Sequence, residues 1–481
     1  MPKGIPQEPS FFRHVGLLAG ASAVGPLIAF AAVPVLTRLY DPMQFGVLGT
    51  FEATLAIALS FCTLRYHLAI AVPEDDADAA ALVVASVAAS ALTSLLLAVL
   101  LHASTVYGGG RPPLDSIARL SWLLPIATFV SGSALALAGW HTRRRTLFQV
   151  AASRVTQGIV QVAVQITLGM LAVLNAGLVV GLVSARFSAL AVLFGRTGLR
   201  QALRQVSRAR LLAAAKQHRR LPLVSTGSAI VNIVGQQLSV LIIGVSFGVQ
   251  AAGLYSLAFL VTVGPAHLVA QAIEQSFLSR IRDAERDARV PELADAVFRL
   301  LVAFTATPAI VFATVAPDAF TLAFGPDWAP AGEFARCLVP SVFAAIVGAH
   351  LPSLVVLRHW QRAEFLFNLL LAAARCGALL WGALAHDPLR AVAAYGAAGT
   401  VLTLGYSCAL LVAEGLNVRA VMTRILRAVT AGLLVATCLL GIRSVLGTAV
   451  ACFLGLLVVA AHVAFTARQA ALPAFEHPAT T

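Results

Sequence analysis

The sequence has little charge and lacks the common patterns of catalytic and metal-binding residues. Only 11% of its 481 residues are charged, whereas soluble domains average about 25%. The six cysteines stand singly, so they form neither a CxxC redox pair nor a zinc-binding set. The eleven histidines form no HExxH pair, and no GxxxxGK[ST] loop is present to bind nucleotide phosphates. These absences predict no metal, no cofactor and no enzymatic activity.

Long apolar stretches take the place of these motifs. The chain is 59% hydrophobic, and its charge-free stretches approach or exceed the roughly 20 residues that a helix needs to cross a membrane. They are His14–Thr37, Ala79–Gly110, Leu120–Thr142, Val155–Ala185, Leu221–Ile273 and Ser444–Ala467. Lipid cannot form hydrogen bonds with the unpaired backbone groups at the edge of an open sheet. A closed barrel would show strands of about ten residues with alternating apolar and polar side chains, and the sequence lacks this pattern. The sequence therefore predicts membrane-spanning helices.

We expect an all-α polytopic membrane protein with about fourteen transmembrane helices, or twelve if the last pair does not span. The expected helices lie near residues 14–37, 45–65, 79–102, 117–140, 148–173, 176–196, 222–247, 251–275, 296–316, 334–356, 363–384, 389–413, 422–441 and 446–466. They form two six-helix lobes around a central cavity, followed by a C-terminal helix pair. The expected divisions are an N-terminal lobe at 1–199, a basic cytoplasmic linker at 200–220, a C-terminal lobe at 221–415, and the helix pair and tail at 416–481.

A weak internal repeat supports the two-lobe division. At an offset of 207 residues, Gly20 falls on Gly227, Tyr40 on Phe247 and Gly46 on Gly253; these six positions are the strongest part of the match. In both copies a long apolar helix ends, a short turn follows, and a glycine opens the next helix. Such duplication is typical of transporters built from two bundles around a central site. Shared membrane composition is the alternative explanation.

Basic residues indicate how the chain is oriented. Short loops rich in Lys and Arg stay in the cytoplasm, and the even-numbered connections contain most of them, including 143–145, 200–220 and 280–289. Both termini are therefore expected in the cytoplasm. The net charge of +13 is mainly a topology signal and predicts no nucleic-acid partner. The 200–220 segment either contacts anionic membrane lipids as an amphipathic helix or only fixes topology.

Polar residues on the fifth expected helix form the clearest candidate site. Arg154, Gln157, Gln161 and Gln165 are spaced by three, four and four residues, which places them on one helical face. One interpretation is the wall of a wet cavity, and the other is hydrogen bonding between helices. Ionisable groups at membrane depth are costly and mark candidate functional sites.

More isolated polar or helix-bending residues complete the candidate set. They are Arg65 and Glu52 on the second expected helix, Arg186 on the sixth, Glu274 on the eighth, and Pro26 beside Gly25 as a possible hinge in the first. The excess of arginine over acid in the first half suits an anionic ligand such as phosphate or pyrophosphate, because the guanidinium presents several donors in one plane.

Three segments resemble a known family. They are Thr37–Gly46, which resembles the first outside turn of bacterial oligosaccharide-lipid flippases; Thr63–Ile70 followed by Pro73, which resembles the inner end of their second helix; and Phe324–Gly332, which resembles the outside loop before their tenth helix. These are the O-antigen and exopolysaccharide flippases of the multidrug/oligosaccharidyl-lipid/polysaccharide exporter superfamily. The family often has Glu where this chain has His67.

The resemblance implies a flippase that moves undecaprenyl-pyrophosphate-linked oligosaccharide from the inner to the outer leaflet by alternating access. It implies anion contacts at Arg154 and Arg65, gating or ion coupling at Arg38, Glu52 and Glu274, and a polysaccharide polymerase as a possible partner. A drug or cation antiporter and a lipid II flippase of the same superfamily remain alternatives. A membrane glycosyltransferase or polymerase would require a large outside loop, and the outside loops here are short.

Overall fold

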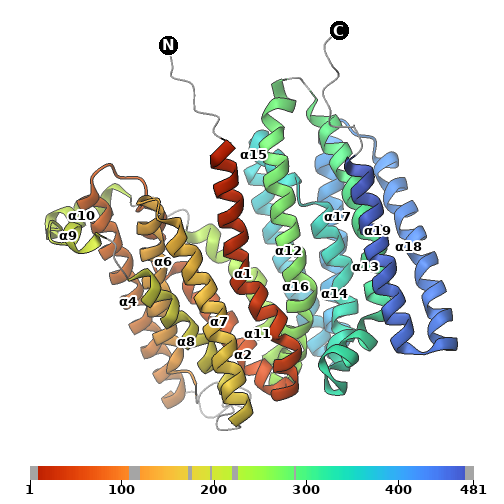
Figure 1. Cartoon of the computed structure of the whole chain (residues 1–481), viewed down its shortest axis with the longest axis horizontal. Coiled ribbons are helices and arrows are strands. Elements are labelled where there is room, and N and C mark those ends of the chain that lie inside the picture. Colours follow the sequence, from red (N-terminus) through yellow and green to blue (C-terminus); the bar gives the residue numbers. More distant parts are fainter. Residues whose placement is uncertain are drawn as a thin grey trace. The chain divides into compact units, whose positions relative to one another are not determined.

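The computed structural model describes residues 9–107, 120–171, 176–194, 198–218, 226–286 and 289–471. Within these ranges every regular element is a helix, and each of the fourteen expected spans coincides with helical structure. Ten described helices are long and apolar enough to cross a membrane, and three further apolar stretches are shorter. The expected class, a polytopic all-α membrane protein, is confirmed (Figure 1).

The chain divides into two compact units, Met1–Gly253 and Leu254–Thr481. The first unit contains α1 (Pro9–Leu39), α2 (Pro42–Phe61), α3 (Tyr66–Ala69), α4 (Asp76–Tyr107), α6 (Leu123–Arg143), α7 (Leu147–Leu171), α8 (Gly177–Leu193), α9 (Leu199–Leu203), α10 (Arg208–Gln217), α11 (Thr226–Phe247) and the start of α12 (Val249–Arg286). The second contains the rest of α12, α13 (Val290–Phe324), η2 (Pro326–Trp328), α14 (Ala329–Val347), α15 (Leu351–Leu357), α16 (Gln361–Leu384), α17 (Pro388–Ala413), α18 (Val418–Leu446) and α19 (Thr448–Ala471). The lobe boundaries expected from the sequence stay a prediction.

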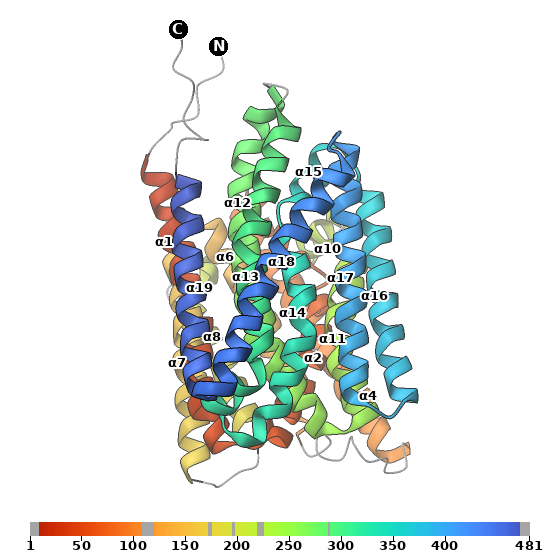
Figure 2. The same ribbon diagram turned by 90° about the vertical axis from the view of Figure 1, so that its right-hand side faces the viewer.

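Each unit has its own apolar core. In the first, Trp140 and Leu82 pack with small alanines of α4 and α6, and Ala214 of α10 joins this cluster. In the second, Phe298 and Leu354 are at the centre of a cluster that also draws on α12, α17 and α18. There α13 packs against α14, α18 and α19 (Figure 2).

Large apolar side chains also cover the outside of the helices. On α16, Leu366, Leu370 and Leu384 are more than half exposed, and only Leu379 and Gly382 are buried. A soluble monomer rarely exposes so continuous an apolar surface. These side chains have the exposure that contact with acyl chains requires.

The first turn of the chain is fixed by local chemistry. Asp41 accepts a hydrogen bond from the Gln44 backbone N–H at 2.8 Å, and the Gln44 side chain accepts one from the Asp41 N–H at 3.0 Å. Pro42 opens α2, where its missing N–H costs nothing. This reciprocal capping box starts α2 immediately after α1 ends.

Glycines allow α2 and the start of α12 to approach closely within the first unit. A Cβ on Gly46 would overlap the carbonyl of Val249, and a Cβ on Gly253 would overlap the carbonyl of Pro42. Gly46 and Gly253 are positions that the 207-residue offset equates, and each is the fifth residue of its helix. The two glycines contact each other.

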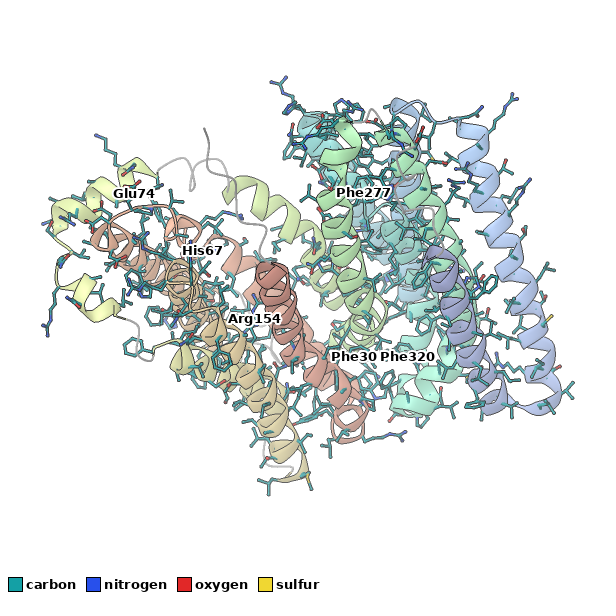
Figure 3. The ribbon with its side chains drawn as sticks, turned by 45° about the horizontal axis from the view of Figure 1, so that its top comes forward. Phe30, His67, Glu74, Arg154, Phe277 and Phe320 are labelled. Atoms are coloured by element: carbon teal, nitrogen blue, oxygen red, sulfur yellow. The ribbon has the colours of Figure 1, made fainter. Side chains whose placement is uncertain are left out.

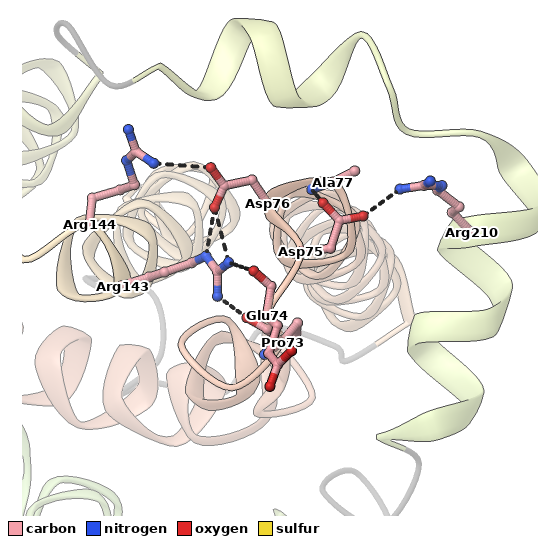
Figure 4. Close-up of polar contacts among 8 residues, drawn as sticks. All are labelled: Pro73, Glu74, Asp75, Asp76, Ala77, Arg143, Arg144 and Arg210. Carbon is pink, nitrogen blue, oxygen red and sulfur yellow. Dashed lines mark hydrogen bonds and ion pairs between the residues drawn. The ribbon is translucent and has the colours of Figure 1, made fainter.

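Ion pairs fasten one end of the first unit. Asp76 accepts hydrogen bonds from Arg143 at 3.0 and 3.1 Å and from Arg144 at 3.0 Å, and Arg143 also donates to the Glu74 carbonyl at 2.8 Å. Arg210 of α10 pairs with Asp75 at 2.8 Å (Figure 4). These carboxylates therefore connect the start of α4 to α6 and α10.

Candidate functional site

The polar stripe of α7 lies in a helix that packs against both α1 and α8. Exposure falls along the stripe: Arg154 is exposed, Gln157 and Gln161 are half-buried, and Gln165 is buried. The four side chains therefore differ in environment, although the periodicity alone makes them equivalent.

Gln165 connects neighbouring helices. Its side-chain amide donates a hydrogen bond to the Leu178 backbone carbonyl of α8 at 2.9 Å. Its backbone carbonyl accepts one from the Tyr40 hydroxyl at 2.6 Å. Gly181 of α8 leaves room for the Gln165 side chain, because a Cβ there would overlap Gln165 Cγ. At this position the structure shows the hydrogen bonding between helices that was one of the two interpretations of the stripe.

Arg154 lies beside the closest crossing of α1 and α7 (Figure 3). A Cβ on Gly25 would overlap the Arg154 carbonyl, and a Cβ on Gly158 would lie 2.7 Å from Gly25 Cα. Pro26, the expected hinge, directly follows this contact in α1. In the described ranges Arg154 forms no ion pair. The sequence analysis named Gly25 only as the neighbour of the expected hinge Pro26. It did not single out Gly158, which lies one turn after Arg154.

Glu52 of α2 and Arg186 of α8 interact electrostatically. The Arg186 Nε is buried and has no hydrogen-bond partner among the described residues. The acid and the base that the sequence assigned to different roles are therefore electrostatically coupled inside the first unit.

Arg65 lies at the turn between α2 and α3. Its backbone is left-handed, with a φ of 57°, and the preceding Leu64 has a φ of 47°. The Arg65 Nε is buried without a hydrogen-bond partner. Two residues on, His67 Nδ1 and the Thr63 hydroxyl are 2.6 Å apart (Figure 3). Left-handed backbone at a non-glycine residue is costly and is often found where a side chain must be aimed.

The remaining candidates lie apart from these groups. Arg38 is exposed in the last turn of α1. Glu274 of α12 belongs to the second unit, where it interacts electrostatically with Glu364 of α16. No group of three or more His, Cys, Asp or Glu suited to a metal ion occurs among the residues that the structure describes.

The family follows from residues 35–333, which match the family of polysaccharide biosynthesis proteins. The chain belongs to this family. No curated protein matches the chain. The matched residues include every candidate side chain except Pro26.

Solved structures show which fold this family member adopts. The structure of the lipid II flippase MurJ in its inward closed conformation matches 94% of this chain and 99% of its own, with 10% identity and a TM-score of 0.72. An inward-facing multidrug resistance MATE transporter of the MOP superfamily matches 83% and 94%, with 15% identity and a TM-score of 0.53. At these identities the matches establish the fold alone.

Proposed function

We propose that this polysaccharide biosynthesis protein is a flippase for oligosaccharides carried on undecaprenyl pyrophosphate. It moves them across the bacterial inner membrane by alternating access, for the synthesis of O-antigen or exopolysaccharide. The family match and the fold support a transporter that acts in glycan assembly. In this proposal both termini lie in the cytoplasm, and a polysaccharide polymerase uses the translocated units.

One observation carries the choice of an anionic, lipid-linked cargo. Arg154 is an exposed cation on a membrane helix, and no carboxylate in the described ranges pairs with it. A charge at that depth requires water or a counter-ion. Pyrophosphate supplies that counter-ion, and a planar guanidinium binds its oxygens with two parallel hydrogen bonds.

The other candidates have supporting roles in this proposal. Arg65, Arg186, Gln157 and Gln161 contact the pyrophosphate or the sugars, and Gln165 holds α7 in place. Arg38, Pro26, Glu52 and Glu274 contribute to gating or ion coupling. Glu52 interacts electrostatically with Arg186, so in this proposal a ligand anion that binds Arg186 competes with Glu52 for it.

Deletion followed by complementation tests the proposal. Without the gene, lipid-linked oligosaccharide should accumulate on the cytoplasmic leaflet, where added glycosidases cannot reach it in intact spheroplasts. Wild type should restore access, and Arg154→Ala should insert normally but restore less than a tenth of it. Arg204→Ala, which removes an exposed cation from the turn after α9, is the matched control. Full export by Arg154→Ala would remove that residue from the site.

A second recipient strain tests the main alternative. A strain that depends on a lipid II flippase for growth should not be rescued by this protein if the cargo is an O-antigen or exopolysaccharide unit. Rescue would instead assign lipid II as the cargo, while the role of Arg154 as an anion contact would stand.

A further inference from the structure

The second unit has an arginine deep inside a membrane helix. Arg375 lies fourteen residues after the first residue of α16 and nine before its last. At 1.5 Å per residue this is about 21 Å from the start of the helix. The residue therefore lies at membrane depth and not at an interface.

The charge of Arg375 is unpaired among the described residues, unlike several other arginines of this unit. Arg358 pairs with Glu414, and Arg443 pairs with Asp318. Arg375 forms no ion pair in the described ranges, and its Nε is buried without a hydrogen-bond partner. On α16 the nearest acid is Glu364, eleven residues and about 16 Å away.

The guanidinium of Arg375 is nevertheless held in a defined place. Its central carbon lies 4.9 Å from the centroid of the Tyr395 ring, and that buried ring meets Tyr255 edge-on at 6.2 Å. A Cβ on Gly399 would lie 2.7 Å from Arg375 Nη2, so only glycine gives the group this space. Stacking uses the face of the guanidinium, whereas its N–H donors point outward in its plane. The contact therefore fixes the cation without using its donors.

A second polar side chain shares this face of α16. Asn368 precedes Arg375 by seven residues, which is two helical turns, and is exposed. It adds a neutral donor and acceptor on the same face. A planar cation with free donors, which no carboxylate of the described residues pairs with, has the chemistry that recognises an oxyanion.

We infer that Arg375, held between Tyr395 and Gly399, is an oxyanion-binding subsite of the second unit that takes a phosphoryl group. The subsite is additional to the one proposed at Arg154. It depends on the proposed function only for the identity of the carrier lipid. The competing role is a purely structural link between α16 and α17.

Binding to the purified full-length protein tests the inference, with inorganic pyrophosphate and undecaprenyl pyrophosphate as probes. Arg375→Gln should weaken binding at least tenfold. Arg375→Lys should weaken binding less, because it keeps the positive charge although it loses the planar guanidinium. Gly399→Ala should also weaken binding, because the added methyl group displaces the guanidinium although every charge is kept. Arg336→Gln is the control: its exposed side chain pairs with Glu333 at 3.1 Å on α14.

The two probes identify the source of the phosphate. Equal losses for both probes assign any phosphoryl oxyanion to the subsite, and a loss confined to the lipid probe assigns the carrier-bound pyrophosphate. Unchanged affinity for both, or a lower melting temperature with unchanged affinity, would leave Arg375 as a structural link only. Arg154→Gln measured in parallel separates the two proposals, because either variant can lose affinity without the other.

A measurement on the wild-type protein covers the case in which the variants do not fold. Phenylglyoxal modifies accessible arginines, and peptide mass spectrometry reports the modification at Arg375. Pyrophosphate should protect Arg375 and leave the modification of Arg336 unchanged. Equal modification of Arg375 with and without pyrophosphate would overturn the inference.

Discussion

Arginines at the helix ends and arginines within the helices have opposite surroundings. At the ends, Arg143 and Arg358 each pair with an acid at the end of another helix. Within the helices, Arg154 and Arg375 have no acidic partner in the described ranges. The chain has 34 Lys and Arg but only 21 Asp and Glu, and many of its acids are used at the ends. The difference teaches that Arg154 and Arg375 keep their charges available to a ligand.

The two groups should therefore respond differently to substitution. The ion pairs at the helix ends connect helices, so breaking one should lower the stability of the fold. The loss should be small where the pair is exposed. Arg154 and Arg375 form no ion pair in the described ranges, so their substitution should affect transport more than stability. The predictions below test this separation, starting with the largest effect.

The largest effect is expected from removing both unpaired arginines. A charge-assisted hydrogen bond contributes about 1.5 kcal/mol or more, so losing two such contacts should slow translocation roughly 100-fold. The Arg154→Gln, Arg375→Gln double variant should keep a wild-type melting temperature. The amount of lipid-linked oligosaccharide that stays protected from added glycosidases in spheroplasts measures translocation, and thermal melting of the purified protein measures stability. A fall in melting temperature with normal turnover per folded molecule would reverse the comparison.

A smaller effect, on stability alone, is expected at Glu414. Its carboxylate is 2% exposed and accepts two hydrogen bonds of 2.8 Å from Arg358. Glu414→Gln leaves that guanidinium without its counter-charge and should destabilise the protein by about 2 kcal/mol, less than for a fully buried pair because Arg358 is partly exposed.

Denaturation of the purified protein measures the Glu414 effect, and transport per folded molecule should stay normal. The control is Arg390→Gln, which breaks an exposed pair with Asp387 at 3.0 Å and should cost less than 1 kcal/mol. Equal costs for the two variants would show that burial does not set the strength of the end pairs.

The sequence predicted the helices well because the cause is local. A charge-free stretch of sufficient length must become a helix in lipid, and Asp41 followed by Pro42 is a local start signal for α2. The tenth expected helix, 334–356, is not continuous in the structure. There α14 ends at Val347 and α15 begins at Leu351.

The partners of the charges could not be predicted, because they come together only in the folded chain. Asp76 and Arg143 are 67 residues apart, and Arg424 and Asp295 are 129 apart. The 3.6-residue period placed Arg154 and Gln165 on one face of a helix but could not show that one is exposed and the other is hydrogen-bonded to α8. Gly399 carries no signal of its own either, since its role depends on a side chain of the preceding helix.

The smallest effect is expected at Asp75, and it depends on pH. The Ala77 backbone N–H and then the Arg210 guanidinium, at 3.1 and 2.8 Å, hold the pKa of this carboxyl below its ordinary value. A lowered pKa in the folded state means that the pair stabilises the fold above the ordinary pKa of about 4 and stops doing so as the pH falls through the folded value. Arg210→Gln should therefore lower the melting temperature at pH 7, by about 1 °C because both side chains are exposed.

At pH 3 or in 0.5 M salt the difference between Arg210→Gln and wild type should shrink, since protonation or screening already weakens the pair. Arg204→Gln, whose side chain forms no ion pair in the described ranges, should match wild type at both pH values. A difference for Arg210→Gln that persists at pH 3 would mean that this arginine stabilises the α10–α4 contact through the packing of its aliphatic stem. In that case the arginines at the helix ends would not act through their charge alone, and the contrast with Arg154 and Arg375 would have to rest on packing as well as on pairing.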